Sequence, residues 1–280
     1  GTHLEYITSG FSTAPNVPYT GSQASPWSTK GDRDLYFRRF AKMMVENPVV
    51  ALDCGFNAAG LFISFIPEMD HNPIKANLGE SSIGKSLDAE TGMSMRGYPP
   101  MFLKNMDATD NALKSRMRNF NHTGGAVDEV GSGDDKNLKE KLANIYQWAS
   151  GNPRGRTQKN AFSGEYEERS PDGERYYYTL MLTGEESFVN MDDANTGNKV
   201  RLTQIIFGKN NPLWHGIKNK DEAEEWRKFI YANHGWLYPE LVRAIAQNPD
   251  TCKEYYSKFS ARLTGHTESQ QQARKANAWA

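Results

Sequence analysis

The chain has 280 residues, of which 38% are hydrophobic and 11% aromatic. This is enough for one large or two small cores and excludes a fully disordered chain. With 33 basic and 34 acidic residues, any nucleic-acid contact has to come from a local basic patch. Two distant cysteines, Cys54 and Cys252, and scattered histidines predict buried thiols in a cytoplasmic protein without a zinc site. No apolar run has membrane-spanning length, so no membrane contact is expected.

The first helix is expected at 34–48, after an extended lead-in rich in Ser, Thr, Pro and Gly. Leu35, Phe37 and Phe40 lie near one helical face, and the pattern stops at Asn47-Pro48. The apolar run GLFISFI at 60–66 predicts a strand.

The segment NLGESSIGKSL, residues 77–87, fits the pattern G-x-x-x-x-G-K-[ST] through Gly79, Gly84, Lys85 and Ser86. In such a loop, glycines let backbone N–H groups point at an anion, the lysine reaches the β- and γ-phosphates, and the hydroxyl coordinates Mg²⁺. The pattern is short enough to arise by chance, and a serine-rich turn is the alternative. A strand expected at 74–78 and a helix running to about 95 provide the context that a phosphate loop requires.

Downstream, the short apolar stretch around Ala126 and Val127 ends in the acidic pair Asp128-Glu129. In nucleotide hydrolysis such an Asp holds Mg²⁺ directly or through water, and the Glu polarises the attacking water as a general base. Acidic pairs are also common on surfaces, and that reading stays open.

A helix is expected at 137–151 with Trp148 in the core, followed by the basic segment RGRTQKN with Arg154, Arg156 and Lys159. Ser170-Pro-Asp-Gly173 predicts a hairpin turn. Basic loops beside a nucleotide site suit contact with a phosphodiester backbone. An ordinary solvated loop beside a hairpin is the alternative.

A strand of aromatic and aliphatic residues is expected at 176–187, ending in Thr183-Gly184-Glu185. A polar side chain beyond a central strand is placed to contact the attacking water or the γ-phosphate. A further strand carries Arg201, which either pairs with an acid or reaches a neighbouring subunit's γ-phosphate. From Asp221 onward three helices are expected, the first burying Trp226, Phe229 and Ile230.

These segments, in this order, resemble a known family. SSIGKS, VDE, IYQWASGNPRGR, LTGEES, TGNKVRL and NHGWLYPELV are similar to the AAA+ ATPase domain of MCM-like replicative helicases encoded by bacterial mobile genetic elements and phages. That domain was formerly catalogued as a domain of unknown function. The resemblance covers about 71–245. The stretch before Asp128 is richer in glycine than usual, and neither a winged-helix segment after 265 nor a primase or origin-binding module before 71 is recognisable.

The resemblance implies a role for each matching residue. The Walker A loop holding ATP comprises Gly79, Glu80, Ser81, Ser82, Ile83, Gly84, Lys85 and Ser86. Ser86 and Asp128 hold Mg²⁺, Glu129 is the Walker B base, and Thr183 occupies the sensor position, with Glu185 as an alternative. Arg201 is the arginine finger acting in trans, and Asn111 matches a polar position of the family.

The resemblance also implies an architecture: an α/β, three-layer P-loop NTPase (AAA+) core with a mainly parallel sheet and a helical lid. The implied domains are a lead-in at 1–70, an ATPase core at 71–215 and a lid with a polar tail at 216–280. Such a chain is expected to form homo-hexamers around DNA, usually single-stranded DNA in a central pore, and to act as a helicase motor during replication of a mobile element.

Two other functions remain open on the sequence. One is an ATP-binding, DNA-associated scaffold or switch without productive turnover, which does not need Asp128-Glu129 together with Arg201. The other is a small-molecule kinase, which is disfavoured because no arginine-rich lid is evident.

Overall fold

The computed structural model describes residues 7–8, 11–12, 28–66, 69, 71–105, 120–128, 148–151, 156–159, 166–169, 175–185 and 202–265. The helices are α1 (Arg33–Glu46), α2 (Pro48–Ala59), α3 (Lys85–Ser94), α4 (Pro99–Phe102), α8 (Lys220–Ala232), α9 (Leu237–Gln247), α10 (Pro249–Thr264) and the 3-10 helix η1 (Ile63–Phe65). The strands are β1 (Ile7–Thr8), β2 (Phe11–Ser12), β3 (Ile74–Gly79), β4 (Leu103–Asn105), β5 (Thr123–Asp128), β6 (Arg156–Lys159), β7 (Tyr166–Arg169), β8 (Tyr178–Gly184) and β9 (Leu202–Phe207). The fold is mixed α/β.

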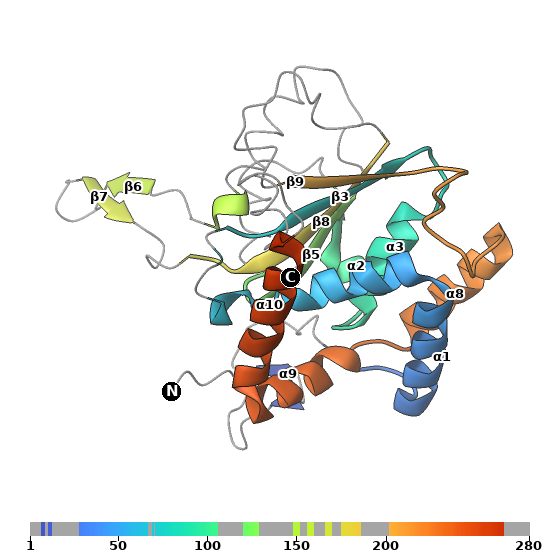
Figure 1. Cartoon of the computed structure of the whole chain (residues 1–280), viewed down its shortest axis with the longest axis horizontal. Coiled ribbons are helices and arrows are strands. Elements are labelled where there is room, and N and C mark those ends of the chain that lie inside the picture. Colours follow the sequence, from blue (N-terminus) through green and yellow to red (C-terminus); the bar gives the residue numbers. More distant parts are fainter. Residues whose placement is uncertain are drawn as a thin grey trace.

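Five strands form one sheet in the order β4-β5-β8-β3-β9. Every neighbouring pair in this sheet is parallel, in agreement with the mainly parallel sheet that the resemblance implies. β3 is therefore a central strand, and β8 lies between it and β5. Figure 1 shows this sheet with α2 and α3 on one side.

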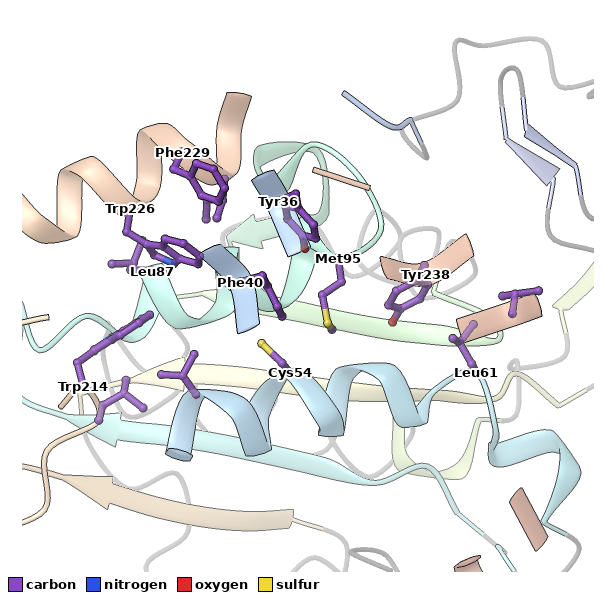
Figure 2. Close-up of a cluster of buried hydrophobic side chains, with 14 of the residues drawn as sticks. Tyr36, Phe40, Cys54, Leu61, Leu87, Met95, Trp214, Trp226, Phe229 and Tyr238 are labelled. Atoms are coloured by element: carbon purple, nitrogen blue, oxygen red, sulfur yellow. The ribbon is translucent and has the colours of Figure 1, made fainter. Parts of the chain in front are cut away.

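The helices α2 and α3 cover one face of the sheet, where α2 packs against β5 and β8 and α3 against β5. Behind them, α1 and α8 bring further aromatic residues into a large apolar cluster that includes Tyr36, Phe40, Trp226 and Phe229. Figure 2 shows these rings gathered above α2, with Cys54 pointing into the cluster. α2 falls in the predicted lead-in at 1–70, yet it packs on the sheet as directly as α3 does.

The opposite face of the sheet carries a second apolar cluster. Ile74, Ala76 and Leu78 of β3 join Leu180 and Leu182 of β8 there. Trp148 packs on the same cluster, so its predicted place in the core is confirmed. The described residues show only 148–150 as helix on this side, so a complete third layer stays a prediction.

Two predicted elements are wrong. Residues 60–66 do not form a strand: α2 ends at Ala59, and a turn and the 3-10 helix η1 follow. A short apolar run has no period that separates a strand from buried helical turns. The basic segment expected as a loop is the other, because residues 156–159 form the strand β6, which pairs with β7; the turn expected at Ser170-Pro-Asp-Gly173 lies outside the described residues.

The remaining elements agree with their sequence patterns. α1 ends at Asn47-Pro48 as expected, although Leu35 is exposed and Tyr36 takes the buried position. α8 buries Trp226, Phe229 and Ile230. No helix in the described part is long and apolar enough to cross a lipid bilayer.

Candidate nucleotide site

The glycine loop joins the end of β3 to the start of α3. Gly79 has φ 147° and Gly84 has φ 90°, conformations that side chains with a Cβ rarely adopt. A Cβ on Gly84 would also lie 2.6 Å from Nε1 of Trp214. That indole nitrogen donates a hydrogen bond to the Gly84 carbonyl at 3.0 Å. Position 84 therefore needs glycine because of its positive φ and because a Cβ would collide with Trp214.

Between the two glycines, Ser82 has φ 67°. A left-handed backbone at a serine costs about 1–2 kcal/mol and persists where the surroundings hold it. Such strain gathers at ligand-binding turns, so Ser82 marks this loop as a candidate site. The serine is exposed.

Lys85 points back into the loop. Its Nζ donates hydrogen bonds to the carbonyls of Gly79 at 2.6 Å and Glu80 at 2.7 Å. Burial lowers the pKa of Lys85, and the nearby carboxylates of Glu185 and Asp128 act in the opposite direction. The ammonium is thus held inside the loop by neutral acceptors that an anionic ligand can replace.

The first turn of α3 offers backbone donors at the same place. Gly84 is the N-cap of α3, and no side chain of the described residues caps it. The first N–H groups of a helix lack partners within the helix and favour negative charge. The loop and helix together therefore form a geometry that suits a phosphate group.

Asp128 and Thr183 lie at the carboxyl ends of β5 and β8, the two strands that follow β3 on one side of the sheet. Asp128 is the last residue of β5, and the Thr183 hydroxyl of β8 donates a hydrogen bond to its Oδ1. The connections after β3 and β8 lead toward opposite edges of the sheet, to β4 and to β9. The carboxyl ends of such neighbouring strands are where open parallel sheets bind ligands.

The structure thus brings Lys85, Asp128, Thr183 and Glu185 to the end of the sheet where its parallel strands finish, beside the loop from Gly79 to Ser86. The half-buried Ser86 lies in the first turn of α3. Hydroxyl and carboxylate oxygens are the donors that Mg²⁺ prefers, so Ser86 and Asp128 fit that ion. In the described part of the chain, no three His, Cys, Asp or Glu side chains gather that could hold a metal by themselves.

Several predicted site residues lie outside the described residues. These are Glu129, Arg201, Asn111 and Arg154. Their roles stay predictions.

One group of site residues escapes the sequence analysis. Lys75 and Asn77 of β3, Asp53 of α2 and Asp88 of α3 are polar or charged and at most 1% exposed. Burial raises the pKa of Asp88 to about 7, although Lys75 and a hydrogen bond from Asn77 lower it. Burial lowers the pKa of Lys75 to about 8, against the charge of Asp88. The sequence feature that could have indicated this group is the alternation of Lys75 and Asn77 with apolar residues in the strand that leads into the loop.

Comparison with known proteins places the chain in a family. Residues 7–163 match the model of a domain of unknown function, DUF927. The chain belongs to the DUF927 family. The DUF927 match includes α1, α2, the glycine loop and Asp128. No curated protein matches the chain.

The fold of this DUF927 chain is similar to that of one solved helicase structure. "SCCmec type IV Cch", an active helicase, superposes with a TM-score of 0.72 at 20% identity, over 95% of this chain and 48% of that one. The chain therefore spans about half the length of that helicase. An inhibitor-bound JCV helicase matches with a TM-score of 0.33 at 11% identity, over 83% of this chain and 70% of that one, which is too distant to support an argument.

Proposed function

We propose that the chain is an AAA+ ATPase module that hydrolyses ATP to drive a DNA helicase. The observation that carries the proposal is the convergence of Lys85, Asp128 and Thr183 beside the start of α3. Similarity of the fold to an active helicase supports the same function. Because the chain covers 48% of that helicase, strand separation would need further parts.

Each residue has a chemical task in this proposal. The loop amides from Glu80 to Gly84 and the ammonium of Lys85 bind the phosphates, which requires Lys85 to exchange the carbonyls of Gly79 and Glu80 for phosphate oxygens. Ser86 and Asp128 would hold Mg²⁺, which neutralises charge on the β- and γ-phosphates. Thr183 orients Asp128 through its hydrogen bond.

Hydrolysis adds water to the γ-phosphorus and breaks the bond to the bridging oxygen of ADP. We assign to Glu129 the acceptance of the proton from that water, and to Arg201 of a neighbouring subunit the stabilisation of the charge that develops. A finger acting in trans implies a ring, which we propose to be a homo-hexamer with single-stranded DNA in its pore. Replication of a mobile element is the process that the sequence resemblance favours.

Steady-state hydrolysis tests the proposal. We expect Mg²⁺- and DNA-dependent release of phosphate from ATP under ring-forming conditions, lowered at least about 100-fold by Glu129→Gln. Lys218→Ala, a change on the protein surface, is the matched control. Binding of ATP without any turnover would instead support a scaffold or switch.

The trans arginine has its own test. Arg201→Ala subunits mixed with Glu129→Gln subunits should recover part of the activity, because some interfaces then combine an intact Glu129 with an intact Arg201. If the mixture stays as inactive as its components, Arg201 does not act across an interface.

A further inference from the structure

Directly beneath the glycine loop, one amide group joins two carboxylates that come from different helices. Nδ2 of Asn77 donates hydrogen bonds to Oδ2 of Asp53 at 2.6 Å and to Oδ2 of Asp88 at 2.8 Å. Carboxylate oxygens accept but do not donate when ionised, so the amide nitrogen has to face them. Asn77 is fully buried, and both bonds are therefore shielded from water.

The same group includes a buried ion pair. Nζ of Lys75 donates to Oδ1 of Asp53, and both side chains are at most 1% exposed. Replacing such a pair by apolar residues of similar size is often neutral or stabilising. Bulk stability is therefore a weak reason for this arrangement, and its position in the fold needs another explanation.

The position of these polar side chains relative to the glycine loop provides that explanation. Asn77 lies two residues before Gly79, and Asp88 lies three residues after Lys85. The backbone N–H of Asp88 also donates to the carbonyl of Gly84 at 3.0 Å. The bond between Asn77 and Asp88 thus joins the strand that enters the loop to the helix that leaves it. Asp53 of α2 accepts hydrogen bonds from Asn77 and Lys75 and so holds the strand to α2.

We propose that Asn77, Asp53 and Asp88 form a positioning brace that holds the two ends of the glycine loop at a fixed separation. A fixed separation keeps the loop amides and Lys85 directed at the phosphate position before the ligand arrives. Hydrogen-bond donors that are already in place avoid the loss of conformational entropy that ordering the loop on ligand binding would cost. The binding part of this inference rests on the proposed function, whereas the geometry of the empty loop does not.

The rival explanation is that the three side chains only stabilise the core. Three variants separate the two explanations. Asp88→Ala removes one of the two carboxylate acceptors of Asn77, the one in α3, and Asp88→Asn keeps an oxygen at the same place. Thr179→Val is the matched control, because it removes a buried hydroxyl that donates to the carbonyl of Asn57 at 3.3 Å, between β8 and α2 and away from the loop.

Hydrogen–deuterium exchange of the nucleotide-free chain is the deciding measurement, made well below the unfolding temperature. In Asp88→Ala we expect amides 80–86 to exchange about tenfold faster, the factor that a lost hydrogen bond to a charged group corresponds to. Asp88→Asn should stay within about twofold of the parent. Thr179→Val should leave these amides unchanged even where it lowers the unfolding temperature.

Binding of a fluorescent ATP analogue with Mg²⁺ is measured on the same four proteins. Faster exchange at 80–86 with weaker binding in Asp88→Ala supports the brace. Unchanged exchange at 80–86 in Asp88→Ala overturns it, whatever the affinity. A parent that binds no analogue while its loop responds as expected contradicts the proposed function and leaves the brace supported. If Asp88→Ala does not fold, Asn77→Ser is measured in its place under the same criteria.

Discussion

The two faces of β3 are equally buried but chemically opposite. On one face, Ile74, Ala76 and Leu78 pack into an apolar cluster. On the other, Lys75 and Asn77 meet Asp53 and Asp88. A strand with such alternation normally has one face in water. Here α2 and α3 cover the polar face, so its polar side chains must find partners inside the protein.

The polar groups of β3 lie on the face that α2 and α3 cover. An apolar residue at position 75 or 77 would fill the same space without needing a partner. The polar face instead makes directional bonds just below the loop, whereas the apolar face contributes only packing. The apolar face should therefore tolerate changes of shape, and the polar face should depend on specific partners.

The largest effect is expected on the polar face. Lys75→Ala leaves the Asp53 carboxylate buried without its ammonium, which should lower the free energy of unfolding by about 3–5 kcal/mol. Urea denaturation measures this loss. The double variant Lys75→Met with Asp53→Leu should recover most of it, because it removes both charges. No recovery in the double variant would mean that the pair does more than balance charge.

On the apolar face, Leu78→Ala should lower the free energy of unfolding by about 2–4 kcal/mol through lost burial and the cavity that remains. Urea denaturation again provides the value. Leu78→Met is the matched control and should cost less than about 1.5 kcal/mol, since volume is nearly conserved. An equally large loss in both variants would show that this face needs a specific shape.

Trp214 contacts the glycine loop directly. Trp214→Phe removes the hydrogen bond to the Gly84 carbonyl and should cost about 1 kcal/mol, measured by thermal unfolding, together with weaker binding of ATP. Trp236→Phe is the control, because its Nε1 donates to the carbonyl of Lys30 at 2.9 Å far from the loop. Equal ATP affinity in the two variants would remove Trp214 from the site.

The smallest effect is expected at Ser82. Ser82→Gly relieves a left-handed serine, which offsets the entropy that glycine loses on folding. It should therefore be more stable than Ser81→Gly by about 1 kcal/mol, as measured by urea denaturation of both. Ser81 has no positive φ, so its glycine variant carries only the entropic cost. The reverse order would contradict the loop conformation.

Much of the fold follows from sequence pattern. The strand, loop and helix at 74–95, the strand ending at Thr183 and the three C-terminal helices are long or strongly patterned, and the structure has all of them. The prediction of a strand at GLFISFI was wrong because this run is short and uniformly apolar. The strand β6 was expected as a loop because the basic segment RGRTQKN has no alternation of apolar and polar residues.

The sequence predicted the site residues that belong to local motifs. It did not predict those that come together only when distant segments pack in the fold. Lys85, Asp128 and Thr183 were expected from local patterns, and the structure brings them together. Asp53 was not, because nothing near it in sequence indicates contact with Lys75, 22 positions away. Polar alternation as in β3 is typical of a strand with one face in water, and the packing of α2 and α3 on that face depends on residues distant in the sequence.

Equilibrium binding of ATP with Mg²⁺ to the 280-residue chain is the direct test of the proposed nucleotide site. We expect saturable binding at one site per chain, weakened at least about tenfold by Lys85→Ala and unchanged by Lys218→Ala. Absence of saturable binding in the parent, or equal affinity in Lys85→Ala, would contradict the assignment of the loop from Gly79 to Ser86 as the site that holds the nucleotide.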